Sequence, residues 1–389
     1  MKVLFISHKP PYPIIDGGCH AMERMLRDFI HCFPNATIDY LSISTEKHPE
    51  IKNSTPSDLG KVSFESIRLS TKLSVLKAFI HLFNNKSYHI SRFENRALQT
   101  KLSELINRKQ FDVIVFESIF AAAHIDQIKS ECNAHLIYRA HNVEHKIWND
   151  LAQGEDNPIK KWYLQHLSKR LKSFELNFIN KVDSIFSISQ IDQTFFKQYS
   201  NHSHYVPVSM IHEQKLLKIK KSICFLGAFN WAPNKEAVMW FVEDIFYNLI
   251  KEFPFLHFEI AGSFSEEISA LAKIKNIRLH GFVDSSKEFM SANGIFVAPL
   301  LSGSGVKMKV IEAMSMGVPC VLSTHAAEGL DLPSIIPICR TKDDFIKKLS
   351  LLLNDEQHCI DIGNAGRTFI QNNFSTELVS KKISAILKL

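Results

Sequence analysis

The chain lacks the cysteine patterns of disulfide-rich and zinc-binding proteins. Its seven cysteines among 389 residues are odd in number and widely spaced, and no two of them form a C-x-x-C pair. No apolar run reaches the ~18 residues that a membrane span needs, and the N-terminal apolar run is too short for a signal peptide. These absences predict a protein of the reducing cytoplasm.

Three further absences narrow the class of function. No G-x-G-x-x-G follows the first predicted strand, and Met308 stands where a third glycine after Gly303 and Gly305 would fall, which argues against a nicotinamide oxidoreductase. No D-x-D motif occurs, so we expect no metal bound through one. The net charge is only +6, and no zinc finger, RNP signature or long basic run predicts binding to nucleic acid.

The length and the repeated alternation of apolar runs with helical patterns predict an α/β protein of two domains. We expect one domain over residues 1–205, a second over 206–373, and a C-terminal helix within 374–389 that packs back toward the first domain. Each domain is predicted to be a doubly wound, Rossmann-like sheet, and the two are expected to face each other across a cleft. Residues 45–61 are expected to form a loop, and 201–209 the crossing between domains. Buried parallel strands are predicted at KVLFIS (2–7), TIDYLSIS (37–44), FDVIVFES (111–118), HLIYRA (135–140), VDSIFSIS (182–189), SICFLG (222–227), LHFEIA (256–261), IRLHG (277–281), GIFVA (294–298) and VPCVL (318–322).

Two segments at the ends of predicted strands are candidates for chemistry in the first domain. Gly17 and Gly18 follow the first strand and precede a predicted helix over 19–33. The segment from His141 to His145, HNVEH, directly follows the strand at 135–140, at the sheet edge where such folds bind ligands. A simple turn is the alternative for the glycines. A metal held by His141 and His145 is an alternative for the second segment, without an evident third ligand.

The stretch from Ala298 to Leu330 predicts a site for a phosphate-bearing ligand. It reads as a strand end, a glycine-rich turn, a helix that contains Glu312, and a second strand. Small residues at 303–305 let backbone N–H groups approach a ligand, and the start of a helix favours negative charge. Lys307 and Lys309 add positive charge to this turn.

The segments 68–92 and 160–181 combine basic residues with apolar residues at helical spacing. Such a stripe usually faces a protein core. A helix on a membrane surface is the alternative.

The second half of the chain carries a family resemblance. The segments FLGAFNWAPNKEAVMWF (225–241), FEIAGS (258–263), GFVDSSKEFMSANGIFVAPL (281–300) and GSGVKMKVIEAMSMGVPCV (303–321) follow one another as in retaining glycosyltransferases of the GT-B fold. With the GG turn and HNVEH, the chain resembles the large family numbered four, the glycosyl transferases group 1. The resemblance implies an enzyme that uses a nucleotide-diphosphate sugar as donor and needs no cofactor.

The resemblance also implies donor-binding residues in the second half. Glu312 resembles the second glutamate of the family's E-x7-E motif, a ribose-binding carboxylate. Gly305 and Val306 resemble the turn whose N–H groups hold the diphosphate and the sugar. Phe282 and Val283 resemble the segment that lines the nucleobase.

In the first half, Gly17 and Gly18 resemble the loop that approaches the diphosphate. His141 resembles the family's histidine near the donor sugar and the acceptor, and Asn142 and Glu144 are expected on the acceptor side.

The chain departs from the family pattern at three positions. Ser304 stands where the first glutamate of E-x7-E is found, and we keep it as a donor contact. Ala228 and Asn230 stand where the family's arginine is found, and Lys235 is expected to replace its lysine. Lys307 and Lys309 are expected to supply the missing positive charge and, with His141, to act in catalysis.

We therefore expect a metal-independent hexosyl- or related glycosyltransferase that retains the anomeric configuration. Its predicted partners are a nucleotide sugar and a glycan or lipid-linked acceptor of cell-surface polysaccharide or glycolipid synthesis. The expected location is cytoplasmic, with peripheral contact at the inner face of the membrane as a variant. Two alternatives stay open: a sugar-nucleotide epimerase on the same fold, and a GT-B binding subunit without activity.

Overall fold

The structure is a computed structural model that describes residues 1–51, 54–72, 81, 82, 84, 86–211, 221–303 and 305–388. The chain divides into two compact domains. The first domain contains residues from Met1 to Val208 and the C-terminal segment from Val379 onward, and the second contains Ser209–Leu378. The chain therefore enters the second domain and leaves it a few residues after the positions expected from the sequence.

The first domain is built on a parallel sheet in which the first strand of the chain lies in the interior of the sheet. In the described residues, seven strands follow the order β3-β2-β1-β4-β5-β6-β7. The chain moves to one edge and then returns to continue beside β1, so that the strand order reverses between β1 and β4. This is the doubly wound order, and ligands bind at such a reversal, outside the carboxyl ends of the strands. The strands are β1 (Lys2–Ser7), β2 (Thr37–Ser44), β3 (Val62–Arg68), β4 (Val113–Glu117), β5 (His135–Ala140), β6 (Ser184–Ser187) and β7 (Ser203–Tyr205).

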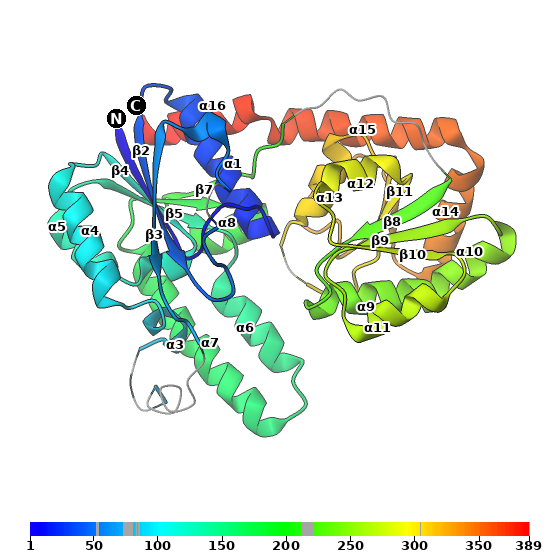
Figure 1. The fold of residues 1–389 in the computed structure, drawn as a ribbon, viewed down its shortest axis with the longest axis horizontal. Helices are drawn as coiled ribbons and strands as arrows, with labels where there is room; N and C mark the ends of the chain where they lie inside the picture. Colours follow the sequence, from blue (N-terminus) through cyan, green and yellow to red (C-terminus); the bar gives the residue numbers. More distant parts are fainter. Residues whose placement is uncertain are drawn as a thin grey trace. The chain divides into compact units, whose positions relative to one another are not determined.

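The helices of the first domain cover both faces of this sheet (Figure 1). Several begin after a residue whose side chain accepts a hydrogen bond from the first helical turn, as Asp16 does for α1 and Asn157 for α7. None of the described helices is long and apolar enough to cross a membrane. The helices are α1 (Gly17–Cys32), η1 (Ser57–Leu59), α3 (Tyr88–Ser91), α4 (Arg96–Arg108), η2 (Ile119–Ala122), α5 (Ile125–Glu131), α6 (Glu144–Gln153), α7 (Pro158–Ile179), α8 (Gln190–Lys197) and α16 (Thr376–Leu387).

Alternation along the strands builds one apolar cluster on each face of the sheet. Leu4 and Ile6 belong to one cluster, and their neighbours Val3 and Phe5 belong to the other. The second cluster also includes Val379 and Ile383, which lie in α16. The C-terminal helix is therefore part of the core of the first domain.

The second domain repeats the same strand order. Its six described strands follow the order β10-β9-β8-β11-β12-β13, all parallel, with the reversal between β8 and β11. Phe258 of β9 packs against Phe241 and Phe246, which lie on the helix that covers one face. The strands are β8 (Ser222–Leu226), β9 (His257–Ala261), β10 (Ile277–Gly281), β11 (Ile295–Ala298), β12 (Cys320–Ser323) and β13 (Ile338–Cys339).

Close packing between α13 and α15 fixes the helix that follows β11. A Cβ atom on Gly363 would lie 2.1 Å from the carbonyl oxygen of Gly317, and Arg367 donates to the carbonyl of Met316 at the end of α13 at 2.8 Å. Only glycine allows this approach at 363. The helices are α9 (Ala232–Trp240), η3 (Phe241–Phe246), α10 (Tyr247–Glu252), α11 (Glu266–Ala270), η4 (Leu271–Lys273), α12 (Ser286–Ala292), α13 (Met308–Ser315), α14 (Lys342–Asn354) and α15 (Glu356–Phe374).

All ten predicted strands are confirmed, and three of the strands in the described residues were not predicted. The crossing expected at 201–209 contains β7, and the other two missed strands are β3 and β13. The helix expected at 19–33 begins earlier, at Gly17, and the loop expected at 45–61 contains η1. Much of the predicted basic helix at 68–92 lies outside the described residues, whereas the one at 160–181 corresponds to α7.

Candidate active site

The reversal point of the first sheet gathers polar side chains at one edge. β1 and β4 are hydrogen-bonded neighbours whose last residues, Ser7 and Glu117, lie opposite each other. His8 and Lys9 follow β1 directly, and His141 follows β5, the next strand. Parallel strands bring their carboxyl ends to the same edge, so these groups meet although His8 and Glu117 are 109 residues apart in the sequence.

His141 is held by a buried carboxylate. Its Nε2 lies 2.7 Å from Oε2 of Glu117, a side chain with no exposed surface. The other oxygen of Glu117, Oε1, is buried without a hydrogen-bond partner in the described part of the chain. Such a carboxylate fixes the orientation of the imidazole, and the carboxylate–histidine pair leaves Nδ1 of His141 for a ligand.

The imidazole of His8 contacts the backbone of Glu117. Its Nδ1 lies 3.3 Å from the carbonyl oxygen of Glu117. Burial, followed by the nearby charges of Lys9 and His141, lowers the pKa of His8 to about 3. His8 is therefore neutral at physiological pH.

The start of α1 is organised by an ion pair. Asp16 accepts a hydrogen bond from the backbone N–H of Cys19 at 2.8 Å, and both of its oxygens accept from Nζ of Lys9 at 2.7 and 2.6 Å. Burial raises the pKa of Asp16, but the hydrogen bonds from His48 and Lys9 outweigh it and hold the pKa below its usual range. Gly17 and Gly18 are the first residues of α1 rather than a separate turn. A Cβ atom on Gly18 would lie 2.9 Å from Nζ of Lys9, so the absence of a side chain at residue 18 leaves room for the lysine.

The two histidines of the HNVEH segment contact different carboxylates. His141 faces Glu117, whereas Nδ1 of His145 lies 2.6 Å from Oε2 of Glu175, which is fully buried. The two histidines therefore do not share a partner, and no group of three or more metal-ligating side chains occurs among the described residues.

Glu144 and Asn142 lie at the start of α6. The backbone N–H of Glu144 donates to Oε1 of Glu175 at 3.2 Å. Burial, with the negative charge of Glu175, raises the pKa of Glu144 to about 7, while a hydrogen bond with Asn142 acts in the opposite direction. A carboxyl group with a pKa near 7 exchanges a proton readily at neutral pH.

The reversal point of the second sheet carries the glycine-rich turn. The turn follows β11, as predicted, and leads into α13. Gly303 and Gly305 have φ angles of 101° and 79°, which favour glycine. Ser304, between them, lies outside the described residues.

The charged groups of this turn have partners in the second domain. Nζ of Lys307 donates to the carbonyls of Gly303 and Gly305 at 3.0 and 2.6 Å, so this lysine closes the turn. Burial lowers its pKa, and Glu328, with an oxygen 3.9 Å away, acts in the opposite direction. Lys309 donates instead to Oε2 of Glu312 at 3.0 Å.

Glu312 is anchored in α13 with 5% of its surface exposed. Oε1 accepts a hydrogen bond from the hydroxyl of Ser286, at the start of α12, and Oε2 accepts from Lys309. Ser286 was not among the predicted site residues. The two donors fix the direction of the carboxylate.

The remaining predicted donor residues lie on the loops after β8 and β10. Phe282 is 72% exposed and follows Gly281, which has a φ angle of 68°. Val283 is partly exposed, and Asn230 is exposed on the loop after β8. Lys235, expected to replace a family lysine, pairs with Glu267 at 3.0 Å.

The sequence predictions name His141 and Glu312 as site residues but not the side chains that contact them. Glu117 falls in the strand predicted at 111–118, and His8 and Lys9 directly follow the strand predicted at 2–7. The available signal was that each stands at the carboxyl end of a predicted strand, where a charged residue is unusual. Which of these ends meet depends on the strand order, and the sequence does not state that order.

Comparison with solved structures defines the class of fold. Sucrose-phosphate synthase from Thermosynechococcus elongatus superposes with a TM-score of 0.71 at 12% identity, over 100% of this chain and 98% of that chain. A mutant of TarM from S. aureus, solved with UDP among its ligands, gives a TM-score of 0.70 at 11% identity over 100% of both chains. The fold is therefore that of the GT-B proteins, as predicted.

Sequence comparison gives a match to part of the second domain. Residues 220–355 match the family model described as glycosyl transferases group 1. This part of the second domain includes the turn and α13. Over the whole chain, a Klebsiella pneumoniae protein described as an uncharacterized 44.6 kDa protein in the cps region is 22% identical across 397 residues, covering 98% of each chain.

Proposed function

We propose that this protein is a retaining glycosyltransferase that moves a sugar from a nucleotide-diphosphate donor to a glycan or lipid-linked acceptor. The observation that carries the proposal is the turn at Gly303 and Gly305 with helix α13, which follow β11 at the reversal point of the second sheet, and Glu312 is anchored in that helix. The match of residues 220–355 to glycosyl transferases group 1 supports it. The cps-region relative supports a role in cell-surface polysaccharide synthesis.

The second domain has the groups that a nucleoside diphosphate requires. The N–H groups at the start of α13 favour a diphosphate, because the unpaired N–H groups and the helix dipole attract negative charge. Glu312 is directed by Ser286 and Lys309 and accepts the ribose hydroxyls in this proposal. Phe282, exposed on the loop after β10, lines the nucleobase.

Sugar transfer requires groups that stabilise the leaving diphosphate. Negative charge develops on the phosphate as the bond to the anomeric carbon breaks, and positive character develops on the sugar. Donors directed at that charge are the largest catalytic contribution, and removal of one costs about 3 kcal/mol or 10²-fold in rate. In the first domain, the Glu117–His141 pair orients the sugar and acceptor, and retention follows from attack on the face that the diphosphate leaves.

A donor screen by thermal unfolding tests the proposal. A ligand at 100 times its Kd stabilises the native state by ~2.7 kcal/mol, so the true nucleotide sugar raises the Tm and its competitors do not. Incubation of that donor without acceptor then separates the alternatives. An altered sugar in the donor indicates an epimerase, and binding without turnover across an acceptor panel indicates a binding subunit.

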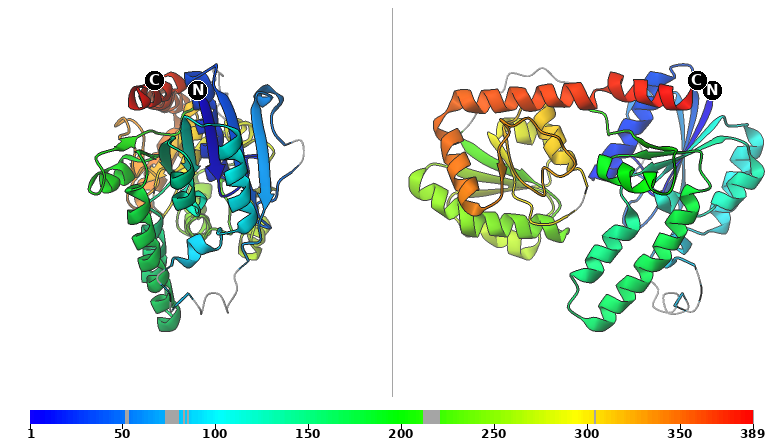
Figure 2. Two further views of the ribbon diagram at one scale, coloured as in Figure 1. Left: turned by 90° about the vertical axis from the view of Figure 1, so that its left-hand side faces the viewer. Right: turned by 180° about the vertical axis from the view of Figure 1, so that it is seen from behind.

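The long helix pair of the first domain supports an acceptor presented at a membrane. Helices α6 and α7 extend together away from the sheet (Figures 1 and 2). Near the start of α7, Ile159 is 78% and Trp162 is 56% exposed. Helix α7 holds five lysine and arginine residues, and its single carboxylate, Glu175, is buried. Exposed apolar and basic side chains together are typical of helices at anionic lipid surfaces.

Liposome flotation tests this part of the proposal. We expect wild-type protein to float with vesicles that contain anionic lipid and not with neutral vesicles. Trp162→Ser should weaken the association, while Trp231→Ser, at a tryptophan of the second domain that is 48% exposed, should not. Equal loss in both variants, or no flotation of the wild type, would remove membrane contact from the proposal.

A further inference from the structure

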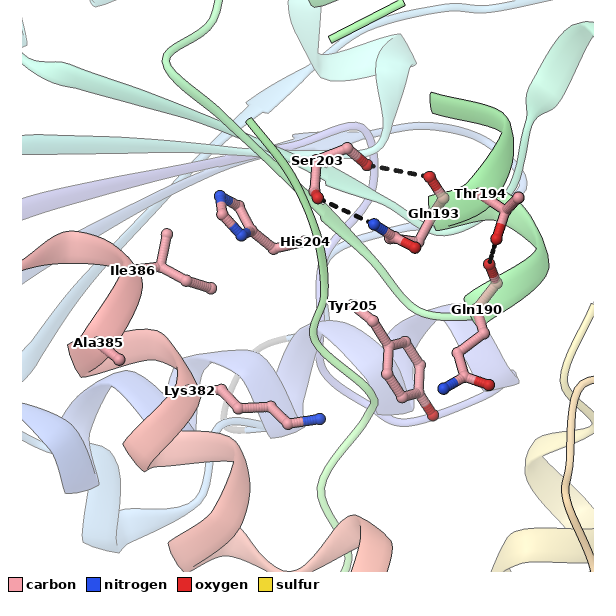
Figure 3. Close-up of a pocket in the computed structure, with 9 residues that line it drawn as sticks. All are labelled: Gln190, Gln193, Thr194, Ser203, His204, Tyr205, Lys382, Ala385 and Ile386. Atoms are coloured by element: carbon pink, nitrogen blue, oxygen red, sulfur yellow. Dashed lines mark hydrogen bonds between the residues drawn. The ribbon is translucent and has the colours of Figure 1, made fainter. Parts of the chain in front are cut away.

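A separate pocket lies at the edge of the first domain. It has a volume of about 550 Å³, within the range of small-molecule sites. β7, the edge strand, forms its floor, and α8 and α16 form its sides (Figure 3). All of its lining residues belong to the first domain. No residue predicted from the sequence as a site residue lines it.

Several lining groups keep hydrogen-bonding capacity that the protein does not use. The backbone oxygen of Gln190 accepts from the hydroxyl of Thr194 at 2.9 Å, but the Gln190 side-chain amide has no partner among the described residues. The hydroxyl of Tyr205 is likewise without one. Burial raises the pKa of Tyr205 to about 12, so its hydroxyl keeps its proton and donates at neutral pH. An amide and a hydroxyl both donate and accept, which suits a ligand rich in hydroxyl groups.

The pocket also holds a cation without a carboxylate. Nζ of Lys382 lies 4.7 Å from the centre of the Tyr205 ring, and no acidic side chain pairs with it in the described residues. None of the lining residues is Asp or Glu. Figure 3 shows the Lys382 amine and the Tyr205 hydroxyl on the same side of the pocket as the Gln190 amide. Burial lowers the pKa of Lys382, and an anion bound beside it would raise that pKa again.

The position of the pocket relates it to the candidate active site. Tyr205 ends β7, and Gln190 begins the helix that follows β6, so both lie toward the carboxyl edge that also carries His141. β7 is two strands from β5, a separation of about 10 Å across the sheet. A short oligosaccharide spans this distance.

We propose that this pocket binds a carboxylate-bearing sugar unit of the acceptor glycan, with Lys382 at the carboxylate and Gln190 and Tyr205 at the hydroxyls. The assignment to the acceptor rests on the proposed glycosyltransferase function. The binding chemistry itself, an anionic saccharide in a pocket with one cation, is independent of turnover and is tested without any donor.

Saturation-transfer NMR on the full-length protein tests the proposal, with glucuronic acid and glucose as the observed probes and with inorganic phosphate, which has no carbon-bound protons, as a competitor. We expect glucuronic acid to bind more tightly than glucose, and Lys382→Gln to weaken its binding at least about tenfold, because a hydrogen bond to a charged group is lost. Lys381→Gln is the matched control, since Lys381 is the exposed neighbour on α16 and does not line the pocket. Tyr205→Phe should reduce glucuronic acid binding and leave phosphate binding unchanged.

Three results would overturn the proposal. These are no binding of glucuronic acid to the wild type, equal effects of the two lysine substitutions, and binding of phosphate that competes fully with glucuronic acid at the same affinity. The Glu312→Gln variant separates this proposal from the proposed function. It should weaken nucleotide binding about 10- to 100-fold but keep glucuronic acid binding unchanged. Glucuronic acid binding in a protein that binds no nucleotide sugar would contradict the proposed function alone.

Discussion

Replacement of Glu312 by glutamine tests the donor site with the least disturbance to the fold. Glutamine has the same shape as glutamate, so its side-chain oxygen still accepts the hydrogen bond from Ser286, but the negative charge is lost. In the proposed complex this charge accepts hydrogen bonds from the ribose. The substitution therefore converts charge-assisted hydrogen bonds into neutral ones.

The expected loss follows from the surroundings of the carboxylate. Glu312 is only 5% exposed, so water screens its interactions weakly. A hydrogen bond to a charged group contributes about 1.5–3 kcal/mol, which predicts a rise of about 10- to 100-fold in the Kd of the nucleoside diphosphate. The pair with Lys309 is lost too, but Lys309 is 42% exposed, so the free energy of unfolding should fall by only about 0–1 kcal/mol.

Isothermal titration calorimetry with UDP, or with the diphosphate of the donor that the screen identifies, measures this effect. Urea unfolding of the same variant measures the stability. Glu288→Gln is the control, because Glu288 is an exposed carboxylate of α12 in the same domain. A Kd within threefold of the wild type for Glu312→Gln would refute a donor contact at this residue, and a loss of several kcal/mol in stability would show that the carboxylate serves the fold instead.

Three further outcomes follow from the structure. Native His8, with a pKa of about 3, stays neutral, while His8 in the unfolded chain takes up a proton below pH 6.5. The free energy of unfolding should therefore fall as the pH drops from 6.5 toward 3, by up to about 1.4 kcal/mol per pH unit. Urea unfolding at several pH values should show a weaker dependence of this free energy on pH for His8→Asn, and an unchanged dependence would contradict this. Gly262→Ala should destabilise the protein by at least about 3 kcal/mol, because the added Cβ would lie 1.7 Å from the carbonyl oxygen of Gly227. Gly281→Ala, at a positive φ with nothing within 4 Å of the added Cβ, should cost only about 1 kcal/mol. Similar losses of Tm in the two variants would show that the clash at residue 262 is relieved. Turnover should survive excess chelator, and its complete loss, restored by a divalent metal, would contradict a metal-independent mechanism.

The sequence predicted the central strands well and missed strands at the sheet edges. β3, β7 and β13 each lie at an edge in the described sheets, with a single neighbouring strand. An edge strand is not buried on all sides, so it lacks the continuous apolar run that marks a central parallel strand. β3 reads VSFESIR, with Glu65 partly exposed, and β7 and β13 are only three and two residues long.

Residues of the candidate site could be predicted where the neighbouring sequence alone marks them. His141 and Glu312 could be named because each stands in a motif next to a strand or in a helix after a glycine turn. Their partners could not be named, since Glu117 and Ser286 come from other elements, and only the folded strand order brings them near. The same holds for the pocket at β7, whose walls join residues near 190 and 205 to a helix near 385.

The anomeric configuration of the product tests the central claim most directly. Once the donor is identified, NMR of the glycoside formed from an α-linked nucleotide sugar and an acceptor gives the configuration of the new bond. A retaining glycosyltransferase produces an α-linked product, and its formation should fall strongly in the Glu312→Gln variant. A β-linked product would contradict the retaining mechanism. A donor that binds the wild type but transfers no sugar to any acceptor would contradict the enzymatic function.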